Sequence, residues 1–212
     1  MIKDSVFLIT GGSSGIGNSI SKFLLTEGAY LTILDLRPLA DSCILNNKER
    51  VLFMLVDVTS AKDTSNALEM TERKFGKLNG VINCAQVKCA NPVFNVVSNE
   101  VHSLQEFIKI LDINLLGTFN VIRLSIPLLA KSSDGIIINT SSRFGHKSVA
   151  YSASKAGIIG ITQPLSKELH QHEIRVVDIA LGKSDENLNV QFGKFIKSII
   201  ETTTFNGISL KF

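Results

Sequence analysis

Short apolar runs alternate with segments of helical periodicity along almost the whole chain of 212 residues. The runs are rich in Val, Ile, Leu and Phe and are bounded by polar residues or glycine, which is typical of central strands with both faces covered. The predicted strands are Val6–Thr10, Leu31–Leu34, Val51–Val56, Val81–Asn83, Ile136–Asn139, Arg175–Ile179 and Ile208–Leu210. This alternation predicts a doubly wound α/β fold with one mainly parallel sheet of seven strands.

Helical periodicity fills the segments between these runs. Helices are expected from Ile16 onward, around Ala67–Phe75, between Leu104 and Leu129, from near Tyr151, and over Val190–Ile200. Pro127 is expected to end or kink the longest of them. Cys84–Ser103 is predicted to be a long connection, and connections of that length usually have a functional reason. Because no linker or repeat interrupts the chain, residues 1–212 are expected to form one domain.

Composition narrows the classes of protein that remain. Hydrophobic residues make up 44% of the chain and charged residues 19%, so a sizeable core can form and extensive disorder is excluded. The formal net charge is +3 and the basic residues are dispersed. A surface that follows a phosphate backbone is therefore not indicated, and no nucleic-acid partner is expected.

The cysteines and the hydropathy pattern bear on the compartment. Cys43, Cys84 and Cys89 lack the paired spacing of a disulfide framework or a zinc site, so no metal site is predicted. They are expected to be reduced and largely buried, as in an intracellular protein. There is no run of eighteen apolar residues, and Met1–Asp4 leads directly into the first strand, so neither a membrane span nor a leader peptide is expected. A soluble intracellular protein, cytoplasmic or mitochondrial, is the expectation.

A glycine-rich loop, Thr10-Gly11-Gly12-Ser13-Ser14-Gly15-Ile16-Gly17, follows the first strand and opens a helix. Glycine lets the backbone turn tightly and approach a pyrophosphate, which the free N–H groups of the helix N-terminus then face. A plain strand-to-helix turn is the alternative, but the strand, the helix and an acidic residue downstream supply the context of a dinucleotide-binding Rossmann fold. The cofactor contacts expected here are Gly11, Ser13, Ser14, Gly15, Ile16 and Gly17.

The acidic residue is Asp35, at the end of the second strand and eighteen residues past Gly17. A carboxylate at this point accepts hydrogen bonds from both ribose hydroxyls and repels a 2′-phosphate. Arg37 follows two residues later and softens that repulsion, but neither Ser13 nor Ser14 is basic. The residues therefore favour NAD over NADP.

Tyr151 and Lys155 stand at i and i+4 in a predicted helix, so they share one helical face. A phenol titrates near pH 10 in water, and a neighbouring ammonium together with a cationic nicotinamide is expected to lower that pKa. Ser141 and Ser142 are expected to follow the fifth strand and to donate to a substrate oxygen. Alone, such a pair also fits a helix with a surface lysine; its combination with the glycine loop makes it specific.

Taken together, these motifs resemble the short-chain dehydrogenase/reductase family over nearly the whole chain. The matching pieces are Thr10, Gly11, Gly15 and Gly17; Asp57-Val58; Asn83-Cys84-Ala85; Asn114; Asn139-Thr140-Ser141-Ser142; and Tyr151 with Lys155. Within the family, Leu111–Leu124 and Tyr151–Ile161, with Ala85–Leu104, are similar to the type-2 3-hydroxyacyl-CoA dehydrogenases, also called type-10 17β-hydroxysteroid dehydrogenases.

The resemblance implies a role for each matching residue. Tyr151 is the general acid/base, Lys155 lowers its pKa and holds the nicotinamide ribose, and Ser142, in preference to Ser141, orients the substrate oxygen. Asn114 supports a proton-relay water. The implied cofactor contacts beyond the glycine loop are Asp35, Asp57, Val58, Asn83, Ala85, Tyr151 and Lys155.

The resemblance also implies the reaction and the assembly. The reaction is hydride transfer between NAD and C3 of a 3-hydroxyacyl-CoA, or of a hydroxysteroid or other secondary alcohol. The apolar stripe Leu111, Leu115, Phe119 and Ile122 is expected to pack against the sheet or another subunit. Together with the Tyr151 helix it implies a homodimer or homotetramer.

Four features depart from the family pattern. Gln86 stands where a glycine is usual, the segment between Ser142 and Tyr151 is short, and Leu181-Gly182 replaces Pro-Gly with no threonine after it. The chain then reaches its last helix with few residues in between, so a substrate lid is shortened or missing after Gly182. Two explanations are open: either the chain has diverged and lost its lid and with it activity, or the sequence omits mobile segments of the active-site loops. Retention of Asn114, Ser142, Tyr151 and Lys155 favours an active enzyme over the competing class, a nucleotide-binding scaffold with impaired catalysis.

Overall fold

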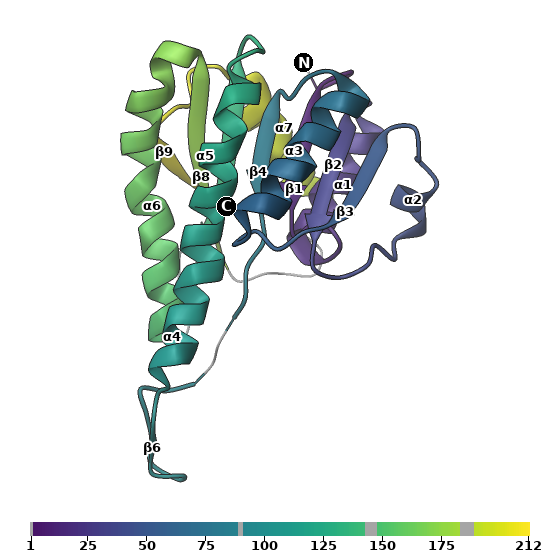
Figure 1. Cartoon of the computed structure of the whole chain (residues 1–212). Coiled ribbons are helices and arrows are strands. Elements are labelled where there is room, and N and C mark those ends of the chain that lie inside the picture. The colour runs from purple at the N-terminus through teal and green to yellow at the C-terminus, as the bar shows by residue number, and fades with distance from the viewer. Residues whose placement is uncertain (1, 89–90, 143–147, 183–188) are drawn as a thin grey trace.

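The computed structural model describes residues 2–88, 91–142, 148–182 and 189–212. Its main sheet has seven strands in the order β3-β2-β1-β4-β7-β8-β9, and every neighbouring pair is parallel (Figure 1). The strands are β1 (Val6–Thr10), β2 (Tyr30–Asp35), β3 (Val51–Leu55), β4 (Gly80–Asn83), β7 (Gly135–Ser142), β8 (Ile174–Leu181) and β9 (Ile208–Lys211). A separate antiparallel hairpin consists of β5 (Phe94–Asn95) and β6 (Glu100–Val101).

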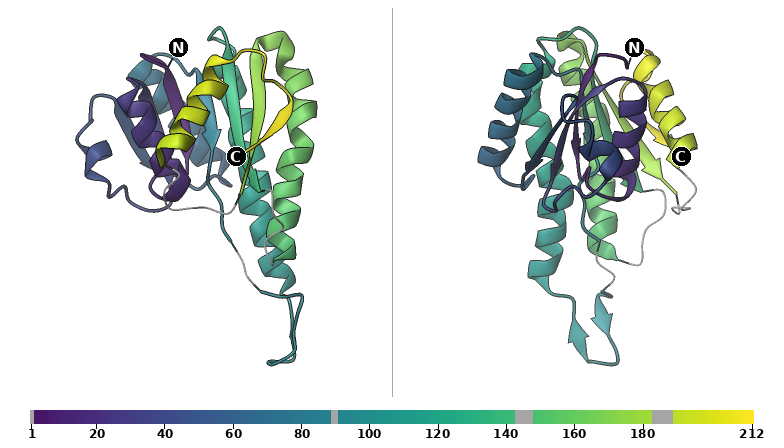
Figure 2. Two further views of the ribbon diagram at one scale, coloured as in Figure 1. Left: turned by 180° about the vertical axis from the view of Figure 1, so that it is seen from behind. Right: turned by 90° about the vertical axis from the view of Figure 1, so that its right-hand side faces the viewer.

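Helices cover both faces of the main sheet, as Figures 1 and 2 show. One face carries α1 (Gly15–Thr26) and α7 (Asn189–Glu201), with the short α2 (Ser42–Leu45) beside α1. The other face carries α3 (Ala61–Phe75), α5 (Gly117–Leu129) and α6 (Val149–Leu169). A π-helical turn, η1 (Asp112–Leu116), joins α5 to α4 (Leu104–Leu111), which extends past the sheet toward the hairpin, and a 3₁₀ turn, η2 (His170–His172), follows α6.

The strands are apolar along their length because successive side chains enter two different cores. Phe7 and Ile9 of β1 pack into the cluster under α1 and α7, whereas Val6 and Leu8 pack into the cluster under α3, α5 and α6. A sheet with only one buried face would alternate apolar and polar residues instead. Both clusters contain fully buried side chains, which fixes the sheet between two helical layers.

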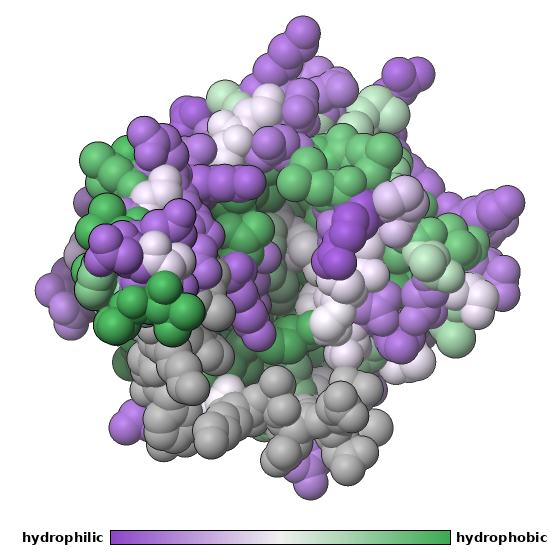
Figure 3. Space-filling model, turned by 90° about the horizontal axis from the view of Figure 1, so that it is seen from below, coloured by the Kyte–Doolittle hydropathy of each residue, from purple (hydrophilic) through white to green (hydrophobic). Residues whose placement is uncertain are grey.

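The strand order creates a topological switch point between β1 and β4. From β1 the chain moves outward to β2 and β3 and then returns to place β4 on the other side of β1. The loops after β1 and β4 therefore diverge at the carboxyl ends of their strands and leave a crevice, which is where ligands bind in open α/β sheets. Figure 3 looks onto this edge and shows the molecule hollowed there.

The predicted doubly wound fold with seven strands is confirmed, and each predicted strand corresponds to an observed one. Two expectations were wrong. Cys84–Ser103 is not only a connection, because it carries the β5–β6 hairpin. Ser141 and Ser142 lie inside β7, because β8 pairs with that strand as far as Ser142. Pro127 lies in the last turn of α5, two residues before the helix ends at Leu129, and the predicted kink stays a prediction.

Burial of the cysteines was only partly as expected. Cys84 is buried behind the β4 loop, and burial raises the pKa of its thiol to about 12. Cys43 is exposed, since α2 lies at the outer edge of the sheet, so its predicted burial was wrong. Cys89 lies outside the described residues.

Candidate active site

The glycine loop lies at the switch point with a backbone that side chains would disturb. Gly11 and Gly15 have φ angles of +67° and +51°, a region that L-residues rarely adopt. A Cβ atom on Gly11 would lie 2.9 Å from the Ala85 Cα, and one on Gly17 would lie 2.3 Å from the Gly11 carbonyl oxygen. Around Gly15 there is no atom within 4 Å of the Cβ position, so the loop is open where helix α1 begins.

Asp35, at the end of β2, is tied to this loop by hydrogen bonds from two backbone amides. Its carboxylate accepts one from Ser13 N–H at 3.0 Å and one from Arg37 N–H at 3.0 Å. The Arg37 side chain lies 3.8 Å from the same carboxylate and donates to the Ser14 hydroxyl. The end of β2 and the glycine loop are therefore held together by contacts within the chain itself.

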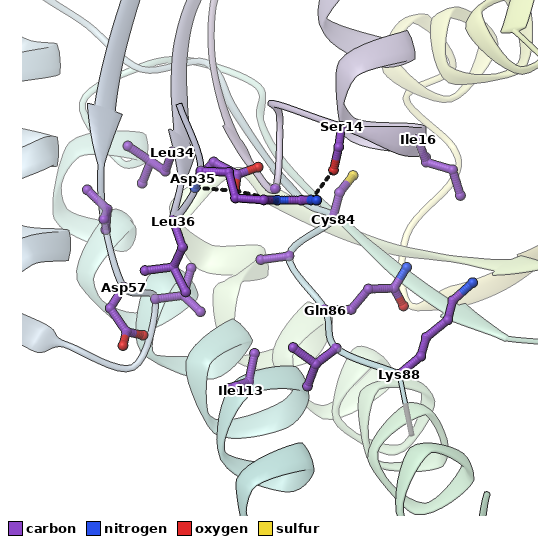
Figure 4. A pocket seen from close by; sticks show the side chains of 18 residues that line it. Ser14, Ile16, Leu34, Asp35, Leu36, Asp57, Cys84, Gln86, Lys88 and Ile113 are labelled. Carbon is purple, nitrogen blue, oxygen red and sulfur yellow. Dashed lines mark hydrogen bonds and ion pairs between the residues drawn. The ribbon is translucent and has the colours of Figure 1, made fainter. Parts of the chain in front are cut away.

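These groups line a cleft of about 520 Å³ between the ends of β1, β2 and β4. Figure 4 shows Ser14 and Asp35 on one side of it and Gln86 and Lys88 on the other. Of the predicted cofactor contacts, the lining includes Gly11, Ser14, Gly15, Ile16, Gly17, Asp35, Asp57, Val58 and Ala85. Ser13, Asn83, Tyr151 and Lys155 are not in the lining. The lining also includes apolar residues that the sequence analysis did not single out, namely Leu34, Leu36, Val56, Val87 and Ile113, together with Arg37, Cys84, Gln86 and Lys88.

The loop after β4 is fixed by side chains from neighbouring elements. The Thr10 hydroxyl accepts hydrogen bonds from the backbone amides of Cys84 and Ala85, both at 3.1 Å. Asn83 is buried at the end of β4, where its amide donates to Asn139 Oδ1 at 2.9 Å. Asn83 thus acts on the shape of this loop from within the sheet.

Asn114 holds the same loop from the opposite side. It is completely buried in the π-helical turn η1, where its Oδ1 accepts from Val87 N–H at 2.8 Å and its Nδ2 donates to the Val87 carbonyl at 3.0 Å. Its Nδ2 also lies 3.1 Å from the Ser154 hydroxyl of α6. The irregular turn therefore places one amide between the β4 loop and the helix that carries Tyr151.

Tyr151 and Lys155 are both buried on the inner face of α6. Lys155 Nζ donates to the Thr140 carbonyl of β7 at 2.9 Å and lies 5.6 Å from the centroid of the Tyr151 ring. Burial lowers the pKa of Lys155 to about 8 and raises the pKa of Tyr151 to about 12. In the chain without a cofactor, desolvation of the phenolate sets the direction of the Tyr151 shift. The predicted lowering of this pKa by Lys155 together with a cationic nicotinamide stays a prediction.

Gln86 contacts the reactive end of Tyr151. The phenol donates a hydrogen bond of 2.7 Å to Gln86 Oε1, and Gln86 also lines the cleft. The sequence analysis marked Gln86 only as a departure from a usual glycine. Its contact with Tyr151 joins residues 65 positions apart and depends on the fold.

The two serines of β7 differ in their surroundings. Ser141 is buried and donates to Asp178 Oδ2 at 2.6 Å, across the pair of strands β7 and β8. Ser142 is half-buried at the end of β7, and residues 143–147, which connect it to α6, lie outside the described residues. The predicted lid region after Gly182 also falls on residues 183–188, outside the description.

Two further properties concern the described part of the chain. It contains no group of three His, Cys, Asp or Glu side chains that could hold a metal ion. Among its helices, none is long and apolar enough to cross a membrane.

A parallel sheet with a glycine loop at its switch point, beside a buried Tyr-Lys pair, defines a nucleotide-dependent oxidoreductase of the Rossmann type. The chain belongs to the short chain dehydrogenase family, whose model matches residues 5–195. It is thus an oxidoreductase that acts on CH–OH groups, in a family that uses NAD(P).

Three curated relatives illustrate the similarity. Ipsdienol dehydrogenase of Ips pini is 39% identical over 243 aligned positions, covering 98% of this chain and 95% of the relative. The 3-hydroxyacyl-CoA dehydrogenase type-2 of Drosophila melanogaster is 39% identical, with 86% of this chain and 76% of the relative covered. The human protein of the same name is 36% identical, with 85% and 74% covered. Because 243 aligned positions exceed the 212 residues of this chain, the first relative carries residues that this chain lacks.

Solved structures agree on the fold. A short chain dehydrogenase from Mycobacterium smegmatis superposes with a TM-score of 0.85 at 22% identity, covering 99% of this chain and 92% of that one. A dehydrogenase/reductase from Sinorhizobium meliloti 1021 gives a TM-score of 0.86 at 21% identity, with 99% and 93% covered.

Proposed function

We propose that this protein transfers a hydride between NAD and a secondary alcohol or ketone, and that its substrate is a 3-hydroxyacyl-CoA. The observation that carries the proposal is the position of the buried Tyr151 and Lys155 pair beside the cleft of the glycine loop. The Tyr151 hydroxyl reaches Gln86, which lines that cleft. This contact brings the one buried phenol of the site to the edge of the crevice in which a dinucleotide fits. A substrate carbon between the Tyr151 phenol and a dinucleotide in the crevice would lie within reach of both groups.

The residues of the cleft fit a dinucleotide. Gly11, Gly15 and Gly17 leave the start of α1 open to a pyrophosphate, whose charge the helix N-terminus stabilises. Asp35 keeps lone pairs on both carboxylate oxygens for ribose hydroxyls after accepting from Ser13 and Arg37. The remaining contacts are assigned to Asp57 and Val58 for the adenine and to Asn83 and Ala85, through the β4 loop, for the nicotinamide side.

Asp35 also supports NAD over NADP. Its carboxylate is buried, and Arg37, the cation that lies close to it, is exposed over most of its side chain and already engaged with Ser14. A 2′-phosphate would therefore meet an anion that Arg37 only partly offsets.

Bound NAD supplies the hydride acceptor, or as NADH the donor, and the chain supplies the proton transfer and orientation. Tyr151 holds the proton that moves to or from the substrate oxygen, with Ser142 as the second group that orients this oxygen. Lys155 is anchored on the Thr140 carbonyl beside the phenol, where its ammonium donates to the nicotinamide ribose and stabilises the phenolate once the cofactor adds its positive charge. Asn114 keeps the β4 loop and α6 in register and supports a relay water.

The acyl-CoA substrate is inferred from the relatives named 3-hydroxyacyl-CoA dehydrogenase type-2. The relative named ipsdienol dehydrogenase favours a second candidate substrate, a smaller secondary alcohol. The sequence analysis gave a hydroxysteroid or other secondary alcohol as the alternative to a 3-hydroxyacyl-CoA. A scaffold with impaired catalysis is a third candidate, and the hydrogen bond that covers the Tyr151 hydroxyl favours it.

NADH oxidation with acetoacetyl-CoA tests the proposal, comparing the protein with Tyr151→Phe. Loss of the phenol proton is expected to reduce kcat/KM roughly 10²- to 10⁴-fold, while the dissociation constant for NADH, measured by its fluorescence, changes by less than about threefold. Turnover with another secondary alcohol but not with the thioester would select the second candidate. Binding of NADH without turnover of either substrate would select the scaffold.

A further inference from the structure

Gln86 offers the phenol of Tyr151 the same acceptor that a ketone substrate would offer. A carboxamide oxygen and a ketone oxygen are both carbonyl acceptors, and the 2.7 Å between Tyr151 Oη and Gln86 Oε1 is an ordinary distance for an O–H···O=C hydrogen bond. A phenol has one proton to donate. While that proton is directed to Gln86, a substrate carbonyl cannot accept it.

Hydrogen bonds fix the backbone on both sides of Gln86, and this orients its side chain toward the Tyr151 hydroxyl. The residue before it, Ala85, donates its amide to the Thr10 hydroxyl, and the residue after it, Val87, is held through both its N–H and its C=O by Asn114. Both anchors are buried. Because the loop itself is clamped, the contact breaks by rotation of the Gln86 side chain or of the Tyr151 O–H bond and not by movement of the loop.

We propose that Gln86 is an internal competitor of the substrate oxygen, which must be displaced from the Tyr151 hydroxyl before each reduction begins. The inference rests on the proposed function, since it concerns the same site. It makes Gln86 a specificity-determining residue: substrates whose carbonyl is a strong acceptor, and whose acyl group leaves room for the displaced side chain, are selected over weaker ones. The apparent affinity for the substrate is then the affinity of the site with a free Tyr151 proton, multiplied by the fraction of time for which that proton is free.

Two substitutions separate hydrogen bonding from crowding. Gln86→Ala removes both the acceptor and the bulk, and Gln86→Leu keeps similar bulk without an acceptor. If the hydrogen bond is the competitor, both variants lower KM for acetoacetyl-CoA in the NADH assay by about two- to tenfold, the range of one net hydrogen bond. If only Gln86→Ala lowers KM, bulk is responsible and the proposal is overturned.

A substrate-independent measurement uses the composition of the chain, which has two tyrosines and no tryptophan. With ¹³Cζ-labelled tyrosine, the protein gives two Cζ resonances, and Tyr30→Phe assigns the one that belongs to Tyr151. Because Oε1 stabilises the neutral phenol, both Gln86 variants are expected to lower the pKa of Tyr151 by about half a unit to one unit. Because burial places the pKa of Tyr151 at about 12, the titration is followed up to pH 12, and the Cζ resonance of the variants is expected to shift at a lower pH than that of the unsubstituted protein.

The two measurements keep this inference distinct from the proposed function. An unchanged Tyr151 titration in both variants overturns the inference whatever the activity. A shifted titration with no turnover in any of the three proteins retains the hydrogen bond and overturns the dehydrogenase assignment. A shifted titration with turnover gained or KM lowered in both variants supports the two together.

Discussion

At the scale of single residues, cofactor choice depends on one carboxylate and one guanidinium. Asp35→Asn keeps the shape and the acceptor oxygen for one amide but removes the charge. Arg37, no longer paired with a carboxylate, becomes available to a 2′-phosphate. We expect NADPH to gain on NADH in relative affinity by on the order of tenfold.

Fluorescence titration of both nucleotides measures this ratio. Asp41→Asn is the matched control, because Asp41 pairs with Lys22 and does not line the cleft. If Asp35→Asn weakens both nucleotides equally, the carboxylate serves only to hold the glycine loop, and the assignment of NAD loses its support.

A second residue-scale effect concerns Asp178, which is fully buried between Ser141 and Ser209. Burial raises the pKa of its carboxyl above the value of 3.8 that it has when unfolded. Between these two pKa values the folded protein binds more protons than the unfolded chain, so the free energy of unfolding falls as pH rises through this window. Above the folded pKa the loss is complete and constant.

Asp178→Asn removes that titration. In urea unfolding between pH 4 and pH 7, the stability of the variant relative to the unsubstituted protein is expected to improve steadily with pH, by about 1.4 kcal/mol for each unit by which the pKa is raised. Taking the difference between the two proteins cancels the other carboxylates. Parallel curves for the two proteins would mean that the carboxyl titrates normally despite its burial.

At the scale of elements, the sequence predicts strands better than it predicts their ends. The apolar runs of the inner strands β1, β2, β4, β7 and β8 could be predicted because strands covered on both faces are apolar throughout. The edge strands β3 and β9 are partly exposed. β7 extends three residues beyond the predicted Asn139 since its polar end is satisfied by neighbours: Thr140 donates to the Asn83 carbonyl, and Ser141 donates to Asp178. Such pairings come from other strands and leave no mark in the run itself.

The same limit applies to the site. The glycine loop and the Tyr-Lys pair could be predicted because each is a local spacing on one element. The clamp of Asn114 on Val87 and the contact of Gln86 with Tyr151 could not, because they join residues that only the fold brings together. The β5–β6 hairpin was missed because its strands are two residues long and exposed.

The glycine loop makes an element-scale prediction. In Gly17→Ala the added Cβ would lie 2.3 Å from the Gly11 carbonyl oxygen, and backbone cannot give way as a flexible side chain does. The loop must shift, so NADH binding is expected to weaken by at least roughly tenfold, with a loss of about 1–3 kcal/mol in the free energy of unfolding. Asn18→Ala, one residue further along α1, is the control and should leave both quantities nearly unchanged. NADH affinity in Gly17→Ala equal to that of the control would show that the cofactor does not use this loop.

At the scale of the whole molecule, the helices α4, α5 and α6 and the turn η1 expose several large apolar side chains. These are Leu104, Ile108, Leu116, Phe119, Val149 and Ile159. Exposed apolar surface, where it is contiguous, marks interfaces between proteins. The predicted stripe thus divides, because Ile122 is fully buried whereas Phe119 is 44% exposed. We propose that two copies of this chain pair through the face that carries the exposed side chains.

Phe119→Glu places a charge in the middle of that face and is expected to convert the dimer to a monomer, because an unpaired charge at a dry interface costs several kcal/mol. Leu45→Glu on α2, at the far edge of the sheet, adds the same charge to an exposed leucine and should leave the dimer intact. Light scattering coupled to size-exclusion chromatography gives the mass of each protein, and a mass twice that of the dimer would identify a tetramer. Phe119 lies two and three residues before Val121 and Ile122, which are the buried residues of the same helix, so unfolding of the variant must be excluded by an unchanged Tm. An unsubstituted protein that is monomeric at micromolar concentration would contradict the pairing, and the apolar face would then need another partner.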